Sequence, residues 1–188
     1  GAEPGQRGRL NRQFPFVQDG MRTGTYGRDV QRGGPMSVSH VPERFNAVTP
    51  SLVVTPCAEA IDFYVKAFGA TEIEPRMTGP DGLVGHAEIE IEGCVIMLGD
   101  EWPDGPTKSP TTLGDSTSAL FIYTADVDAL WKQAIDAGCT EVFPLELQFY
   151  GDKSGRLQDP FGHTWGLGQH VEDVSPEEME RRMAAFYE

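Results

Sequence analysis

His86 and Glu88 are the residues of this chain whose types and spacing best suit chemistry. Residues i and i+2 of a β-strand lie on the same face, so an H-x-E pair places an imidazole beside a carboxylate. Such a pair can transfer a proton near neutral pH, or give a divalent metal two of its ligands. Spacing supplies no third ligand, and a hydrogen-bonded or solvated polar face is the simpler explanation. We therefore take His86 and Glu88 as catalytic candidates and expect no metal.

The strand expected around this pair, residues 84–91, decides which way the pair faces. Apolar and polar residues alternate along it, with Ala87, Ile89 and Ile91 interleaved with His86, Glu88 and Glu90. This period of two predicts one face packed on a core and one polar face that carries the pair. Glu92 and Gly93 then form a tight turn into the next strand.

The elements around this strand occur twice in the sequence. Sliding the chain by 69 positions lays residues 52–73 on residues 121–142, with identities at Thr55/Thr124, Ala60/Ala129, Gly69/Gly138, Thr71/Thr140 and Glu72/Glu141. Each copy contains a short apolar strand, a helix with one apolar face, a glycine and the start of another strand. A repeat present only twice predicts a pseudo-symmetric domain of two βαβββ modules, with the functional site where the modules face each other.

These modules set the expected organisation of the chain. Residues 41–100 form the first module, residues 118–170 the second, and residues 101–117, which show neither strand nor helix pattern, link them. The strands are expected at residues 48–54, 71–77, 84–91, 94–98, 118–123, 141–147, 155–158 and 164–167. Residues 171–188 carry a final helix that starts at the capping box of Ser175. Its apolar stripe consists of Met179, Met183 and Phe186, and its predicted ion pairs are Glu177–Arg181 and Glu178–Arg182.

Composition limits the classes of function. The longest apolar runs are about five residues against the roughly 20 of a membrane helix, so we expect no membrane span. The first residues lack the apolar centre of a secretory signal, which favours a cytoplasmic protein. The three cysteines, Cys57, Cys94 and Cys139, are widely spaced and predict reduced, buried structural thiols.

Charge is divided unevenly along the chain. Residues 1–40 carry a net charge of +3, and subtracting this from the total of −14 leaves −17 on residues 41–188. An acidic body repels phosphates, so no nucleic acid partner is expected, and it favours either cationic small molecules or simple solubility. The basic arm, residues 1–40, is Gly- and Arg-rich. We expect its apolar stretch from Phe14 to Val17 to dock in an apolar groove, on the partner subunit if a dimer forms, with its arginines facing acidic neighbours.

Several motifs resemble the vicinal oxygen chelate superfamily, which includes glyoxalase I, extradiol dioxygenases and bleomycin resistance proteins. They are Ile61-Asp62-Phe63-Tyr64, Phe68-Gly69-Ala70 and Asp159-Pro160-Phe161-Gly162-His163, in a doubled βαβββ order. The stretches Gly85–Glu88, Tyr150–Asp152 and Val171–Pro176 are similar to the PhnB-like bacterial branch. The resemblance implies an α+β fold in which paired glyoxalase-type modules form an open curved mixed sheet. It also implies a homodimer.

The resemblance further implies a metal held by residues of the first and last strand of each module. Those positions correspond to Thr49, Met97, Ser118 or Ala119, and Gly166. Hydroxyls and a thioether are poor ligands for Zn, Ni or Fe, and glycine has no side chain. We therefore expect no metal and no other cofactor.

The expected cleft then has an apolar and aromatic lining. Candidate ligand-binding residues are Met97, Phe121 or its neighbour Leu120, Tyr150, Arg156 and Trp165, although Met97, Phe121 and Trp165 suit a plain core equally well. The leading hypothesis is a metal-free protein that binds a small organic molecule. The negative charge of residues 41–188 favours a cationic one. The alternatives are a lyase, isomerase or dioxygenase with a relocated metal or an acid/base site at His86 and Glu88, and an interaction module with a vestigial cleft.

Overall fold

The computed structural model describes residues 38–187, and residues 39–188 form one structural unit. The expected docking of Phe14–Val17 lies outside the described residues. The first module consists of β1 (Ser51–Val53), α1 (Cys57–Phe68), β2 (Thr71–Thr78), β3 (Val84–Ile91) and β4 (Cys94–Gly99). Its four strands form one sheet in the order β1-β4-β3-β2, in which β1 runs parallel to β4 and the other pairs are antiparallel.

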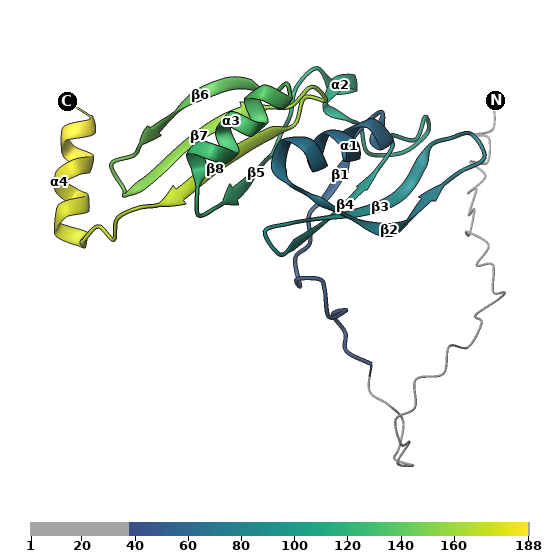
Figure 1. Ribbon diagram of the computed structural model, residues 1–188, viewed down its shortest axis with the longest axis horizontal. Coiled ribbons are helices and arrows are strands. Elements are labelled where there is room, and N and C mark those ends of the chain that lie inside the picture. Colours follow the sequence, from purple (N-terminus) through teal and green to yellow (C-terminus); the bar gives the residue numbers. More distant parts are fainter. Residues whose placement is uncertain (1–37, 188) are drawn as a thin grey trace, which may run out of the picture. The chain divides into compact units, whose positions relative to one another are not determined.

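The second module repeats this topology (Figure 1). It consists of β5 (Ala119–Tyr123), α3 (Val127–Ala137), β6 (Thr140–Leu147), β7 (Asp152–Gln158) and β8 (Thr164–His170), with the strand order β5-β8-β7-β6. The α+β class and the paired βαβββ order are thus confirmed. The strands form two four-stranded sheets, one to each module.

The link between the modules contains a helix that the sequence pattern did not predict. This helix, α2 (Pro110–Leu113), is a single turn. Its ends carry ordinary signals, because Pro110 opens the first turn and Gly114 follows the last residue in the left-handed conformation, with φ 76°. Four residues are too few to show a helical period, so only these end signals were available from the sequence.

The two modules differ by one residue between the first strand and the glycine that ends the helix. Leu52 of β1 and Ile122 of β5 are both buried, so they are the equivalent residues of the two first strands, and they lie 70 positions apart in the sequence. The glycines with positive φ in the two modules keep the spacing of 69, as Gly69/Gly138, Gly82/Gly151 and Gly93/Gly162. Accordingly α3 has 11 residues where α1 has 12. The predicted equivalence of Leu52 with Phe121 is therefore wrong by one residue, and a slip of one reverses the face of a strand.

The modules share one hydrophobic core, to which α1 and α3 contribute as they pack against each other (Figure 1). Asp159 lies inside this core, and four groups donate hydrogen bonds to its carboxylate. They are the Tyr64 hydroxyl at 2.9 Å, Trp165 Nε1 at 2.8 Å, and the backbone N–H groups of Phe161 and His163, both at 2.9 Å. Because Tyr64 belongs to the first module, this buried and fully paired carboxylate ties the two modules together.

The last helix, α4 (Pro176–Phe186), contains no buried residue. Ser175 caps it as expected, by accepting a hydrogen bond from the Glu178 N–H at 3.3 Å. The predicted Glu178–Arg182 pair forms at 2.7 Å, whereas Arg181 pairs with Glu178 instead of Glu177. The reason is that Glu178 lies one turn from both arginines and accepts bonds from both. Among the described residues no helix is long and apolar enough to span a bilayer.

Candidate ligand-binding groove on the second sheet

A groove with a volume of about 510 Å³ lies over the second sheet. Its aromatic lining residues are Phe121, Phe143, Tyr150 and Phe186. Its polar residues are Glu146, Gln148, Ser154 and Arg156. A smaller pocket of about 220 Å³ lies between β1, the link around α2 and His163. We call the larger feature the second-sheet groove.

Strand register places the central residues of this groove in one row across the sheet. Phe121 pairs with Gly166, Gly166 pairs with Arg156, and Arg156 pairs with Phe143. Residues that pair across neighbouring strands lie on the same face of the sheet, so these four share the groove side. Ser154 lies two residues before Arg156 on β7 and belongs to the same face.

The ring of Phe121 forms the floor of the groove and lies across β8. A Cβ atom added at Gly166 would stand 2.3 Å from Phe121 Cδ2, and one added at Gly168 would stand 2.7 Å from Phe121 Cε1. Only glycine at both positions leaves room for the ring. Phe121 is nevertheless 47% exposed, and its centroid lies 4.8 Å from that of Tyr123. The floor is therefore a flat aromatic surface open to the groove.

Arg156 is the cation of the groove, and Phe143 positions it. The guanidinium carbon lies 5.8 Å from the centroid of the Phe143 ring, within the range of a cation–π contact. Four of the five arginines in residues 38–187 form ion pairs, namely Arg44, Arg76, Arg181 and Arg182. Arg156 has no carboxylate within ion-pair distance among the described residues.

Hydrogen bonds around Asp152 connect β5, β7 and β8, the strands that carry Phe121, Arg156 and Gly166. Tyr123 donates its hydroxyl to Asp152 Oδ2 at 2.7 Å, and the pKa of Tyr123 is raised chiefly by this bond. His170 Nδ1 lies 2.7 Å from Asp152 Oδ1, and His170 Nε2 lies 3.0 Å from Asp173 Oδ1. Hydrogen bonds to Asp173 and then to Asp152 raise the pKa of His170.

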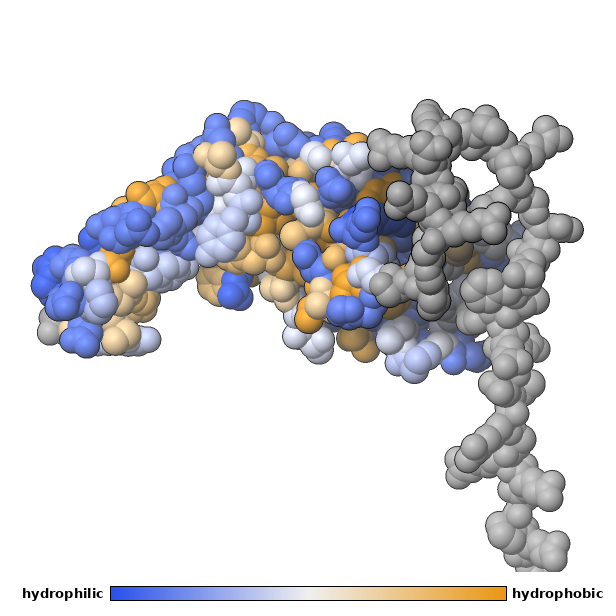
Figure 2. Space-filling view, turned by 90° about the horizontal axis from the view of Figure 1, so that it is seen from below, coloured by the Kyte–Doolittle hydropathy of each residue, from blue (hydrophilic) through white to orange (hydrophobic). Residues whose placement is uncertain are grey.

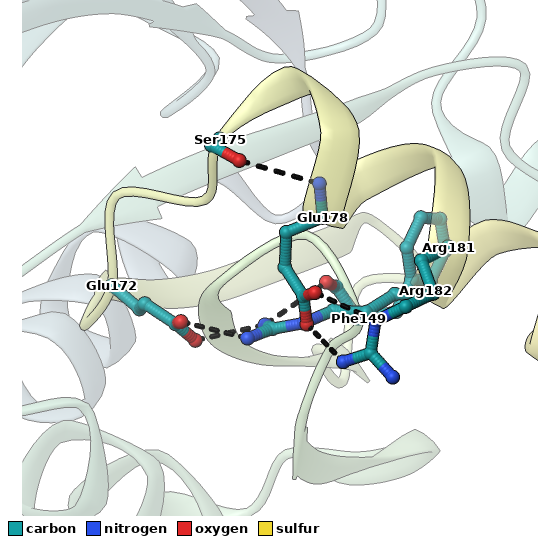
Figure 3. A network of polar contacts seen from close by, with 6 residues as sticks. All are labelled: Phe149, Glu172, Ser175, Glu178, Arg181 and Arg182. Atoms are coloured by element: carbon teal, nitrogen blue, oxygen red, sulfur yellow. Dashed lines mark hydrogen bonds and ion pairs between the residues drawn. The ribbon is translucent and has the colours of Figure 1, made fainter.

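One end of the groove is formed by Phe186 of α4. Contacts of the Arg182 side chain hold this helix in place (Figure 3). This side chain pairs with Glu172 and Glu178, each at 2.7 Å, and reaches the carbonyl oxygen of Phe149 at 3.4 Å. Bonds from Arg181 and Arg182 lower the pKa of Glu178 to about 2. Phe186 packs on Phe149 with ring centroids 5.3 Å apart. Figure 2 shows hydrophobic residues at the end of the molecule that α4 forms, beside strongly hydrophilic ones.

The residues suggested by sequence are divided between three places. Phe121, Tyr150 and Arg156 line the second-sheet groove. His86, Glu88 and Met97 belong to the first sheet, where Glu88 pairs with Met97 in register. Trp165 is completely buried in the core, with its ring 4.5 Å from that of Phe68 and its Nε1–H bonded to Asp159, so it lines no cleft.

The His86–Glu88 pair forms as the spacing predicted, but a cation already faces it. His86 Nε2 lies 3.1 Å from Glu88 Oε1. Glu88 Oε2 is buried and lies 2.7 Å from Arg44 Nη2, in an ion pair whose angles do not make a hydrogen bond. Neither residue lines the second-sheet groove. Their role as an acid/base pair stays a prediction.

The residues at the implied metal positions do not fit a metal. Gly166 faces the ring of Phe121, which occupies the space that a ligand side chain there would need. Residues 38–187 contain no group of three or more His, Cys, Asp or Glu side chains placed to hold a metal ion. Thr49, Ser118 and Met97 offer poor donors and Ala119 offers none, so these positions do not suit Zn, Ni or Fe.

The cysteines depart in part from the expectation. Cys57 and Cys139 are buried, and burial raises the pKa of each thiol to about 12. Cys94, at the start of β4, is exposed, which corrects the expectation of three buried thiols. Asn46 Nδ2 lies 3.8 Å from Cys94 Sγ.

Sequence reasoning missed Phe143, Glu146, Gln148 and Phe186 as groove residues. Residues 140–147 of β6, the edge strand, read Thr-Glu-Val-Phe-Pro-Leu-Glu-Leu and show no alternation, so no local signal placed Phe143 opposite Arg156. Phe186 was identified only as part of an apolar helix stripe. Nothing in its spacing indicated that α4 closes one end of the groove.

The doubled βαβββ topology, with one four-stranded sheet to each module, defines the class of fold. This chain belongs to the Glyoxalase/Bleomycin resistance protein/Dioxygenase superfamily, whose model matches residues 44–167 and so spans both modules.

Among its relatives is the uncharacterized protein Rv0887c of Mycobacterium tuberculosis, 42% identical over 158 residues, which are 82% of this chain and 90% of that protein. The uncharacterized protein At5g48480 of Arabidopsis thaliana is 27% identical over 128 residues, covering 65% of this chain and 76% of that protein. TioX from Micromonospora sp. ML1 has a similar structure, with a TM-score of 0.53 and 22% identity, over 67% of this chain and 99% of TioX. Protein PA1353 from Pseudomonas aeruginosa also has a TM-score of 0.53, with 19% identity, over 66% and 98% of the two chains. These structural likenesses show the shared fold.

Proposed function

We propose that this protein binds a small organic molecule with an aromatic ring in the second-sheet groove. One observation carries the proposal, namely the exposed ring of Phe121 lying flat over two glycines of β8. Offset stacking of aromatic rings adds to the gain from burying apolar area, so a flat exposed ring is a natural platform for a ligand.

The size and lining of the groove support this proposal. Sites for small molecules usually measure about 300–1,000 Å³ and combine apolar walls with a few polar groups. The second-sheet groove has about 510 Å³, four aromatic side chains and four polar ones. Tyr150 and Ser154, whose hydroxyl oxygens lie 3.2 Å apart, are polar groups that can bond a ligand without large rearrangement.

A simple aromatic amide, 2-naphthamide, tests the proposal. Titrating it into isotope-labelled protein should shift the backbone amide signals of β5, β7 and β8 in NMR spectra. Phe121→Ala should weaken binding at least tenfold, because it removes the platform. Trp102→Ala is the matched control, since Trp102 is a similarly exposed aromatic residue, 45% exposed, that does not line the groove. Shifts confined to elements that do not line the groove, or unchanged binding to the Phe121 variant, would contradict the proposal.

We also propose that the protein acts as a homodimer. Its α4 exposes Met183, which is 43% exposed, and the neighbouring edge strand exposes Leu147, which is 65% exposed. Neither residue lines the second-sheet groove. Burying large apolar side chains contributes about 1.5–3 kcal/mol each, so covering this surface favours association. A second copy of this chain is the partner that the family resemblance implies.

A further inference from the structure

We propose that the ligand of the second-sheet groove carries a carboxylate or a similar planar anion beside its aromatic ring, and that Arg156 binds this anion. The inference rests on the proposed function and adds the charge of the ligand. It opposes the expectation from net charge, which favours a cation because residues 41–188 carry −17.

The position of Arg156 is the first support. It lies on β7, an inner strand of the sheet, and a single strand, β8, separates it from Phe121 on β5. Gly166 is the residue of β8 in the same row. Because Gly166 has no side chain, no side chain of that row stands between the Phe121 ring and the Arg156 guanidinium. A ring stacked on Phe121 would therefore hold a substituent on its edge next to Arg156.

The partners of Arg156 are the second support. The other four arginines of residues 38–187 each pair with a carboxylate, as a strongly acidic protein allows. Arg156 instead contacts the face of Phe143, with 5.8 Å from the guanidinium carbon to the ring centroid. A guanidinium held on an aromatic face keeps its planar fork of N–H donors free for a carboxylate.

Glu146 is the acidic residue of the groove, and its position makes it a rim group. It belongs to β6, the edge strand, and pairs in register with Ser154 and not with Arg156. No described cation lies within ion-pair distance of it. A central cation and a peripheral carboxylate favour an anion at the centre of the groove.

The overall negative charge does not outweigh this local contact. Interactions between exposed charges are largely screened beyond about 8 Å at physiological salt, whereas a hydrogen-bonded ion pair acts at contact. The net charge is therefore expected to slow the approach of an anion more than it weakens the bound state.

Three probes of the same shape test the inference, namely 2-naphthoate, 2-naphthamide and 2-naphthylmethylammonium, with affinities measured by calorimetry. The wild-type protein should bind the naphthoate at least tenfold more tightly than the amide, and the ammonium most weakly. Arg156→Gln should abolish this preference and leave the affinity for the amide within about twofold. Arg156→Lys should retain part of the preference, because it keeps the charge without the planar fork. Glu146→Gln is the matched control and should leave the order unchanged.

The inference is wrong if the three probes bind equally, if the ammonium binds most tightly, or if the preference for the naphthoate survives Arg156→Gln. The proposed function would still stand in each of these cases. If none of the probes shifts signals of the groove, the proposed function itself fails. If Arg156→Gln changes the sedimentation of the protein and leaves the probe preference intact, Arg156 is an interface residue for a second copy, and the inference is wrong.

Discussion

Phe121 lies so close to Gly166 that a single methyl group on that glycine would stand 2.3 Å from the ring. We predict that Gly166→Ala destabilises the protein by about 1–3 kcal/mol, the usual cost of overpacking. In the Phe121→Ala background the same change should cost far less, because the ring is gone. Urea unfolding of the four proteins of this double-mutant cycle measures the coupling.

Gly85→Ala is the matched control for that cycle. A Cβ atom at Gly85 would lie 3.5 Å from Trp102 Cζ2, an ordinary contact, so this change on β3 should be tolerated. Equal costs for Gly166→Ala with and without Phe121 would show that the ring does not fill the space above β8.

Tyr64 and Asp159 connect the two modules, and their hydrogen bond should contribute measurably to stability. Tyr64→Phe leaves Asp159 Oδ2 with the Trp165 bond alone, inside the core. Bonds to charged groups contribute about 1.5–3 kcal/mol, so we expect a loss of that size in the free energy of unfolding. Tyr150→Phe removes the hydroxyl from a 39% exposed tyrosine and should cost under about 0.5 kcal/mol. Similar losses in both variants would refute the role given to the buried bond.

His170 should make stability depend on pH. Its pKa is raised in the folded protein by Asp173 and Asp152, and Asp152 also accepts a bond from Tyr123. A raised folded pKa gives stability that is fully present below the unfolded value of about 6.5 and is lost as pH rises through the folded value. The melting temperature of His170→Gln should therefore fall below that of the wild type by more at about pH 5.5 than at about pH 9.

His40→Gln, a change at an exposed histidine before the first module, serves as the control for this experiment. Its effect on the melting temperature should be small at both pH values. A deficit for His170→Gln that is independent of pH would mean that the contacts of the ring, and not its charge, are what matter.

The homodimer is tested by sedimentation velocity at micromolar concentration. Met183→Glu on α4 and Leu147→Glu on β6 place charges in the apolar surface outside the groove and should shift the protein toward monomer, since burying an unpaired charge is costly. Glu180→Gln, on an exposed position of the same helix, should leave the distribution unchanged. A wild-type protein that sediments as a monomer would contradict the proposal.

Much of the fold could be predicted because its signals are local. Alternation located β3, Asp126 caps α3 by accepting from the Ala129 N–H, and Ser175 starts α4. The misplaced equivalence of Leu52 with Phe121 has a physical reason. Both residues are apolar, so matching by residue type cannot detect a slip of one, although that slip moves Phe121 from the core to the groove.

The residues from Trp165 to Gly168 contain a sequence signal that our prediction of a cleft-lining Trp165 did not use. Residues 165–168 read Trp-Gly-Leu-Gly, in which the two large side chains are buried and the two glycines face Phe121. A period of two with large residues on one face and glycines on the other predicts a flat surface on the glycine side. The pairing of that surface with Phe121 depends on register between strands, which no local pattern fixes.

The most direct test of the central claim is a crystal structure of the protein with 2-naphthoate. We predict that the naphthalene ring stacks on Phe121 and that the carboxylate lies within hydrogen-bond distance of the Arg156 guanidinium. A ligand bound on the first sheet near His86 and Glu88, or a second-sheet groove filled by a neighbouring copy with the ligand absent, would contradict the account.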